Sequence, residues 1–158
     1  MKKTIYWDSN TFLGLLNHED EPENSQMCES VWKSAEQGLS TLLTSTLTIA
    51  EVIHIKGREK LNPSHREKVN LFFRAEHIVL RPLTREIAQL ARDVVWDNAI
   101  KPKDAIHVAT AAYFKLPELQ TLDKGLLAKG RVEIKGFSVM LKEPSGTYQT
   151  SAPLGDQS

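Results

Sequence analysis

The amino-acid sequence predicts an α/β fold in which helices cover a mainly parallel β-sheet. Short β-branched and aromatic runs, which favour strands, alternate along the chain with longer segments in which apolar residues recur at helical spacing. Strands separated by helical segments are joined by right-handed crossovers, which place the strands parallel and the helices on the faces of the sheet. The 158 residues are 41% hydrophobic and 25% charged, as is typical of one globular domain with a substantial core.

The first half of the chain opens as strand, turn and helix. Residues 4–7 are apolar and aromatic and predict a strand, and residues 8–16 follow as a helix with polar groups at its start. After a polar loop, apolar residues at helical spacing predict a second helix with Gly38 at its C-terminal end. Residues 39–45 then predict a buried strand, and another helix begins near Thr48.

The second half continues the alternation. Helices are predicted over 63–75, over 85–98 with Thr84 as N-cap, from Lys101 onward, and briefly after Asp123; strands are predicted over 77–83, 118–122 and 131–140. Residues 143–158 contain too few large apolar groups to pack. The sequence therefore predicts one domain over residues 1–142, followed by a disordered tail.

Charge and cysteine content limit the possible functions. Lys plus Arg and Asp plus Glu number 20 each, so the broad basic surface of many nucleic-acid-binding proteins is missing. Contacts to nucleic acid would depend on local lysines near the acids discussed below, Lys101, Lys103 and Lys124, although solvated surface lysines are the ordinary alternative. The single cysteine, Cys28, excludes an internal disulfide and a cysteine-based zinc site and is expected in the core.

No segment has the run of about 18 apolar residues that a membrane-spanning helix needs. The N-terminal ten residues also lack the apolar stretch of a signal peptide. The sequence therefore predicts a cytoplasmic protein without membrane contact.

Four acidic residues fall at predicted strand ends or helix starts. Asp8 and Asp123 follow strands, whereas Glu51 and Asp104 are predicted within the first turn of helices. Each has an ordinary structural role: Asp8 as N-cap, Glu51 in a capping box with Thr48, Asp104 at a helix dipole and Asp123 in a turn. Because the carboxyl ends of parallel strands share one edge with the starts of the following helices, all four should face the same crevice.

Four carboxylates without an equally placed lysine or arginine repel one another unless a cation is bound. Hard divalent cations with oxygen ligands, Mg²⁺ or Mn²⁺, suit such a group of side chains. The sequence therefore predicts a metal site formed by Asp8, Glu51, Asp104 and Asp123.

Four segments resemble, in order and spacing, the acidic motifs of PIN-domain ribonucleases, especially VapC-type toxins of bacterial toxin–antitoxin pairs. They are YWDSN at 6–10, TSTLTIAEV at 44–52, KPKDAIHVATA at 101–111 and TLDKGL at 121–126. The resemblance covers residues from about Thr4 to Leu141. It implies a PIN-like three-layer α/β/α sandwich with a central, mainly parallel sheet.

The resemblance also implies a metal-dependent endoribonuclease in which the four acids are the metal-binding and catalytic residues. One or two Mg²⁺ or Mn²⁺ ions would lower the pKa of a water that attacks the RNA phosphodiester bond, leaving 3′-hydroxyl and 5′-phosphate ends. Ser9, Asn10 and Thr121 match polar positions of the motifs and are expected to support the metal or a phosphate. The implied partners are an RNA substrate, a cognate antitoxin protein and a second copy of the chain in a homodimer.

Two other interpretations compete with the nuclease. A catalytically inactive PIN-like module could bind RNA or act as a scaffold, although such a module has little use for a repulsive acidic cluster. Glu51 with His54, and Asp104 with His107, also have the i, i+3 spacing of di-iron carboxylate bundles. The α/β alternation argues against a bundle, so both histidines are expected to pack on helix faces, with a contact to the acids as the alternative.

Overall fold

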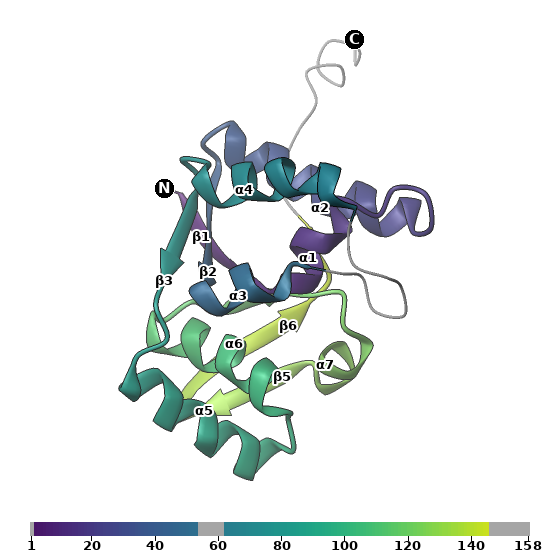
Figure 1. Cartoon of the computed structure of the whole chain (residues 1–158). Helices are drawn as coiled ribbons and strands as arrows, with labels where there is room; N and C mark the ends of the chain where they lie inside the picture. Colours follow the sequence, from purple (N-terminus) through teal and green to yellow (C-terminus); the bar gives the residue numbers. More distant parts are fainter. Residues whose placement is uncertain (1, 54–61, 146–158) are drawn as a thin grey trace, which may run out of the picture.

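The computed structural model describes residues 2–53 and 62–145, which form one six-stranded sheet with helices on both faces (Figure 1). The strands are β1 (Lys3–Trp7), β2 (Ser40–Ser45), β3 (Ile78–Arg81), β4 (Glu118–Gln120), β5 (Arg131–Ile134) and β6 (Phe137–Lys142). The helices are α1 (Ser9–Gly14), α2 (Pro22–Glu36), α3 (Thr46–Glu51), α4 (Arg66–Arg74), α5 (Arg85–Asn98), α6 (Pro102–Tyr113) and α7 (Lys124–Lys129), and a 3₁₀ turn, η1, spans Pro63–His65.

The strand order is β3-β2-β1-β4-β6-β5, and every neighbouring pair is parallel except β5 with β6. The chain builds outward from β1 to β2 and β3, and then returns to place β4 on the other side of β1. Such a reversal leaves a crevice at the carboxyl ends of the two central strands, which is where open α/β sheets bind ligands. The predicted α/β fold with a mainly parallel sheet is confirmed.

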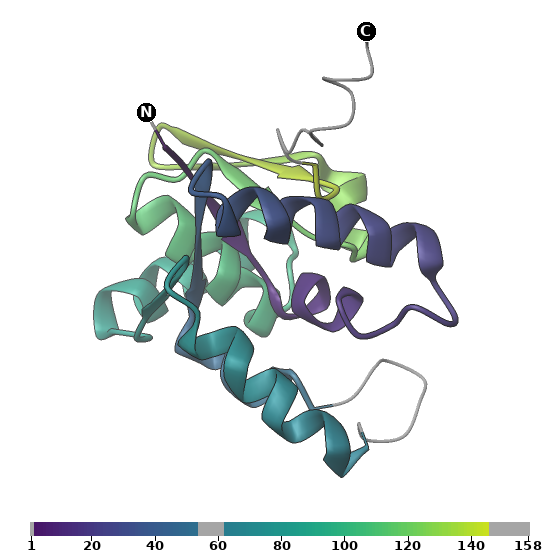
Figure 2. The ribbon, with the colours of Figure 1, turned by 90° about the horizontal axis from the view of Figure 1, so that it is seen from above.

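Alternating residues of the central strands form two separate cores. Ile5 and Trp7 of β1 pack with α1, α2 and α4, whereas Tyr6 packs with α5 and α6. Figure 1 shows α2 and α4 on one side of the sheet and α5 and α6 on the other, and Figure 2 shows α2 running beside α1. Because both faces are covered, β1 and β2 have apolar residues at successive positions, as expected of a three-layer sandwich.

The helix caps explain several element boundaries. Thr84 accepts a hydrogen bond from the backbone N–H of Ile87 at 3.3 Å, so its predicted role as the N-cap of α5 is confirmed. The same helix ends at Ala99, which has a left-handed backbone with φ of 55°. Among the helices of the described residues, none combines the length and apolar character needed to cross a membrane.

The single strand predicted over 131–140 is wrong, because the segment contains two antiparallel strands, β5 and β6. Lys135 and Gly136 join them, and both have positive φ, 48° and 81°. Two successive residues with positive φ form a tight hairpin turn whose twist matches that of the flanking strands. The turn reverses the chain, so that β6 lies parallel to β4.

The predicted boundary at residue 142 coincides with the end of β6. The next residues still contact the domain: Pro144 is buried, and the carbonyl of Ser145 accepts a hydrogen bond from Gln120 Nε2 at 2.8 Å. The remainder of the predicted tail, 146–158, lies outside the described residues, so its disorder stays a prediction.

Candidate functional site

The topology brings the predicted acids to one edge of the sheet. Asp8 directly follows β1, and Asp123 follows β4, the strand on the other side of the reversal. Asp104 lies in the first turn of α6, which leads into β4 from the same edge. These positions are the carboxyl ends of the strands and the start of a crossover helix, as the sequence predicted.

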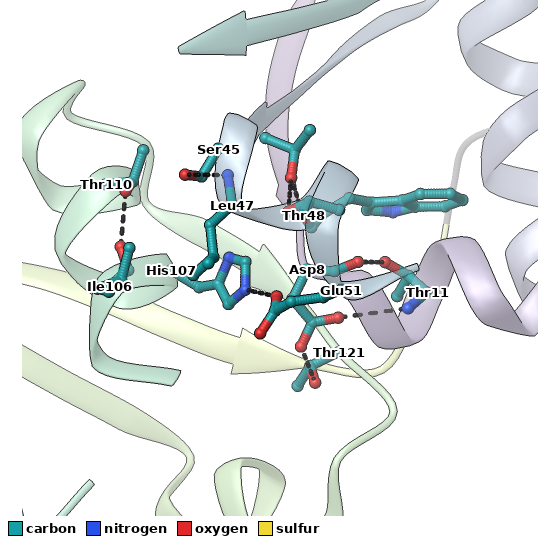
Figure 3. Close-up of polar contacts among 12 residues, drawn as sticks. Asp8, Thr11, Ser45, Leu47, Thr48, Glu51, Ile106, His107, Thr110 and Thr121 are labelled. Carbon is teal, nitrogen blue, oxygen red and sulfur yellow. Dashed lines mark hydrogen bonds and ion pairs between the residues drawn. The ribbon is translucent and has the colours of Figure 1, made fainter. Parts of the chain in front are cut away.

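Asp8 is buried, with 1% of its surface exposed, and both of its carboxylate oxygens are hydrogen-bonded. Oδ1 accepts from the backbone N–H of Thr11 at 3.3 Å, and Oδ2 accepts from the hydroxyl of Thr121 at 2.5 Å (Figure 3). Asp8 is therefore the N-cap of α1 and also one of the four acids, Asp8, Glu51, Asp104 and Asp123, that we call the acidic edge. The two roles agree because capping fixes the direction of the carboxylate.

Thr121 connects two of the acids. Its hydroxyl donates to Asp8 and accepts from the backbone N–H of Asp123 at 3.0 Å. The Asp123 carboxylate in turn caps α7, because Oδ2 accepts from the N–H of Leu126 at 2.9 Å. Thr121 thus lies against two of the acids, and its predicted support of a metal or a phosphate stays a prediction. Ser9, by contrast, makes no side-chain hydrogen bond within residues 2–53 and 62–145.

The carboxylates lie within one another's electrostatic field. Burial raises the pKa of Asp8 from 3.8 to about 6, and Asp104 raises it further against the opposing effects of His107 and Thr121. Burial also raises the pKa of Asp104, and so do Asp123 and Glu51. In the described part of the chain, no lysine or arginine forms a salt bridge with any of the four acids. The acids are therefore coupled, and their charge is offset only in part, by His107 and Lys101, as expected of a cation site.

Glu51 reaches this edge by a route that the sequence did not predict. The predicted capping box is wrong: the N-cap of α3 is Ser45, whose hydroxyl accepts from the N–H of Leu47, and Glu51 is the last residue of the helix. The side chain of Thr48 instead contacts the Thr44 hydroxyl at 2.6 Å. Being free of a capping role, the Glu51 carboxylate meets His107 Nε2 at 2.7 Å (Figure 3).

His107 packs on the buried face of α6, as predicted, and it also makes the contact to the acids that was the alternative. It is 2% exposed, and it joins Glu51 on one side to the hydroxyl of Tyr6, 2.6 Å from Nδ1, on the other. Its i, i+3 spacing from Asp104 was the available signal, because that spacing turns both side chains to the same side of α6. His54, the other histidine with this spacing, lies outside the described residues.

The donor chemistry of the site fits a hard divalent cation. All four predicted ligands are carboxylates, and oxygen is the donor that Mg²⁺ and Mn²⁺ prefer. Among residues 2–53 and 62–145, no three acidic, histidine or cysteine side chains converge closely enough to hold one ion by themselves. Mg²⁺ commonly uses one or two carboxylates and completes its shell with water and substrate phosphate. The residues therefore fit an open site better than a closed protein cage.

A groove of about 340 Å³ adjoins the acids between α1, the start of α2 and the loop into α7. Its lining includes Asn10, Asp123 and Lys124, together with an apolar floor formed by Leu13 and Leu122. Asn10 thus faces the groove that Asp123 also lines. Of the predicted phosphate contacts, Lys101, Lys103 and Lys124 are all exposed; Lys101 also lowers the pKa of Asp104.

Comparisons with known proteins agree with the fold. The PIN domain model matches residues 5–132. VapC20 of Mycobacterium tuberculosis, a sarcin-ricin loop cleaving toxin, superimposes with a TM-score of 0.63 at 17% identity, over 82% of this chain and 98% of its own. A toxin–antitoxin complex from Klebsiella pneumoniae gives a TM-score of 0.53 at 17% identity, over 75% of this chain and 86% of that one. No curated protein sequence matches the chain.

Proposed function

Because this chain belongs to the PIN domain family, we propose that it is a divalent-metal-dependent endoribonuclease and the toxin of a toxin–antitoxin pair. The observation that carries the proposal is the coupling of Asp8, Asp104, Asp123 and Glu51 at one sheet edge, where no lysine or arginine of the described residues is ion-paired with any of them. Burial disfavours the charged form of Asp8 and raises its pKa to about 6, and perturbed pKa values of this kind are typical of functional sites. The two structural neighbours, both associated with toxins, support the second half of the proposal.

The protein's own residues have distinct roles in the proposed reaction. Asp8 and Asp123 are held in place by the hydroxyl of Thr121 and by the helices that they cap, so their carboxylates are oriented before substrate binds. Mg²⁺ or Mn²⁺, when bound, supplies a lower pKa for water and positive charge beside the scissile phosphate. The buried thiol of Cys28, with a pKa raised to about 12, is unsuited to act as a nucleophile. Hydrolysis by water is therefore the route that these residues support.

The groove beside Asp123 is the proposed path of the RNA strand. The amides of Asn10, Asn17 and Asn24 lie along it, and each amide offers both donors and acceptors to a base or ribose. Lys124 lines the same groove and can attract a phosphate toward the acidic edge. This arrangement supplies local attraction in a chain whose net charge is zero.

The proposed partners are a small antitoxin protein and a second copy of the chain. The Klebsiella pneumoniae neighbour is a toxin–antitoxin complex, which supports the first. Trp96 on α5 is 71% exposed, and the Arg92 guanidinium lies 5.2 Å from its ring centre, so an apolar contact surface is available for a homodimer. A monomeric mass in sedimentation at working concentration would contradict the homodimer.

The deciding experiment is cleavage of a mixed cellular RNA pool by purified protein with Mg²⁺, Mn²⁺ or EDTA. We expect cuts with 3′-hydroxyl and 5′-phosphate ends in either metal, none in EDTA, and none with Asp8→Asn that is folded by circular dichroism. Asp97→Asn, on the exposed face of α5, is the matched control and should cleave normally. Expression of the active protein in a bacterium should also arrest growth, whereas Asp8→Asn should not.

Cuts that persist in EDTA or in folded Asp8→Asn would overturn the proposal. Binding of RNA without any cleavage, in every metal and with growth unaffected, would instead identify an inactive RNA-binding module.

A further inference from the structure

A chain of three buried or half-buried side chains connects the core of the sheet to the acidic edge. Tyr6 comes from β1, His107 from α6 and Glu51 from the end of α3. The Tyr6 hydroxyl lies 2.6 Å from His107 Nδ1, and His107 Nε2 lies 2.7 Å from Glu51 Oε1. Tyr6 is fully buried, His107 is 2% exposed, and the Glu51 side chain is 16% exposed. Figure 3 shows the imidazole of His107 directed at Glu51.

The donors and acceptors available to Tyr6 determine which way each hydrogen bond among Tyr6, His107 and Glu51 runs. The Tyr6 oxygen accepts from the backbone N–H of Ser45 at 3.1 Å, so its own proton needs an acceptor elsewhere. The shortest contact of the Tyr6 hydroxyl among residues 2–53 and 62–145 is to His107 Nδ1, at 2.6 Å. The Thr44 hydroxyl is also a neighbour, but it already donates to the Trp7 carbonyl and contacts the Thr48 hydroxyl, so we assign His107 Nδ1 as the acceptor. A neutral imidazole that accepts at Nδ1 carries its proton on Nε2. His107 therefore donates to Glu51, and Tyr6 determines the tautomer that makes this possible.

Among the described residues, the hydrogen bond with His107 is the one side-chain hydrogen bond of Glu51. Glu51 ends a helix of only six residues, which has little stability of its own. Glutamate also has three rotatable side-chain bonds, and fixing them costs conformational entropy. Its carboxylate is nevertheless among the charges that raise the pKa of Asp104, so the conformation held by His107 keeps Glu51 within electrostatic range of that acid.

From this geometry we propose that Tyr6 and His107 are positioning residues that hold the Glu51 carboxylate toward Asp104 and so set the affinity of the acidic edge for its divalent cation. The inference rests on the proposed metal-dependent function and adds two residues to it. Neither residue touches the substrate. Residues that orient a ligand carboxylate in this way typically change metal affinity by about 10- to 100-fold when they are removed.

Two measurements without RNA test the positioning role of Tyr6 and His107. First, imidazole ¹H–¹⁵N spectra of the metal-free protein at neutral pH should show one histidine, assigned by its loss in His107→Gln, with Nε2 protonated and Nδ1 bare. That tautomer preference should weaken in Tyr6→Phe. Second, thermal unfolding over a Mn²⁺ titration should show a half-saturating concentration about 10- to 100-fold higher in His107→Phe. His107→Gln, whose amide can still donate to Glu51, and Tyr6→Phe should show smaller increases.

Activity provides a third readout that a purely structural role would not move. In His107→Phe, RNA cleavage lost at low Mn²⁺ should return as Mn²⁺ is raised, because the defect lies in affinity. Tyr113→Phe, a hydroxyl removal at a half-exposed position of the same helix, is the matched control and should leave all three readouts unchanged.

The outcomes separate this inference from the function on which it rests. A Mn²⁺ response that is lost in Glu51→Gln but unchanged in folded His107→Phe and Tyr6→Phe overturns the positioning role alone. A proton on Nδ1 of His107 in the wild type also overturns it. A wild-type protein that shows no response to Mn²⁺ or Mg²⁺ contradicts the proposed function and the inference together.

Discussion

The buried carboxylate of Asp8 gives the metal-free protein a pH-dependent stability. Its pKa is about 6 in the folded state against an ordinary value of 3.8, so the folded state binds the proton more tightly than the unfolded state. A group of this kind costs nothing well below pH 4; the cost grows as the pH rises from about 4 to about 6 and is constant above that range. At about 1.4 kcal/mol for each pKa unit, ionised Asp8 lowers the free energy of unfolding by up to about 3 kcal/mol at pH 7.

We therefore expect Asp8→Asn in EDTA to be more stable than the wild type at pH 7, and close to it at pH 4. Urea unfolding of both proteins across this range measures the difference. Saturating Mg²⁺ should stabilise the wild type preferentially, because the cation compensates the charge that the variant lacks. A stability difference that stays constant between pH 4 and pH 7 would show that Asp8 does not carry this cost.

Removing the hydroxyl of Thr121 should weaken both the fold and the site. Thr121→Val keeps the shape but leaves an Asp8 oxygen and the Asp123 N–H without their partner. Because both groups are buried or half-buried, we expect a loss of about 1 to 3 kcal/mol in the free energy of unfolding, with reduced cleavage. Thr121→Ser should restore most of both in urea unfolding and RNA cleavage. Equal behaviour of the valine and serine variants would contradict this role.

At the scale of single residues, the sequence predicted where the acids of the site lie but not the hydrogen bonds of His107 with Tyr6 and Glu51. Asp8, Asp104, Asp123 and Thr121 could be located because strand ends and helix starts are visible in local patterns. The contact of His107 with Tyr6 joins residues 101 positions apart, and that with Glu51 spans 56. Pairings over such separations depend on the packing of α6 against the sheet, which local patterns do not describe.

Among the helices, α1 and α2 pack so closely that a glycine is required between them. A Cβ atom on Gly14 would lie 2.6 Å from Cys28 Sγ and 3.0 Å from Leu122 Cδ1. In an exposed helix, glycine to alanine would stabilise by up to about 1 kcal/mol, but here the steric clash opposes that gain. We expect Gly14→Ala to lower the free energy of unfolding by about 1 to 3 kcal/mol, as overpacking of a core does.

The double variant Gly14→Ala with Cys28→Ala is the control for this clash. Removing the sulfur should recover part of the loss, so the two substitutions should be non-additive in a thermal unfolding cycle. Additive effects would place the cost of Gly14→Ala elsewhere, for example in contact with Leu122.

Element boundaries were predictable where a cap is local and unopposed. Thr84 begins α5 as predicted. At α3 two hydroxyl residues compete, and Ser45 is the N-cap because Thr48 is drawn to Thr44 of the preceding strand. The turn between β5 and β6 was missed because Lys135, an unusual residue for positive φ, occupies one of its two central positions.

For the whole molecule, a balanced charge means that attraction to RNA must be local. With 20 basic and 20 acidic residues, there is no general positive field to draw in a polyanion, and the acidic edge itself repels phosphate until a cation is bound. Local positive charge is nevertheless present, because Lys101 and Lys103 lie within three residues of Asp104, and Lys124 directly follows Asp123. RNA binding should therefore depend on a few phosphate contacts and on the cation.

RNA binding through a few local lysines should have a shallow salt dependence. Each lysine contact to a single-stranded phosphate contributes a slope of about −0.7 in a plot of log affinity against log salt concentration. We therefore expect a slope no steeper than about −2 for three lysines.

Binding is measured with Asp8→Asn, which should not cleave, at constant Mg²⁺. Adding Lys124→Ala should make the slope shallower by about 0.7, because this lysine lines the groove beside Asp123. Lys33→Ala, exposed at the far end of α2, is the control and should leave the slope unchanged. A much steeper slope that Lys124→Ala does not alter would locate RNA on a different surface of the molecule.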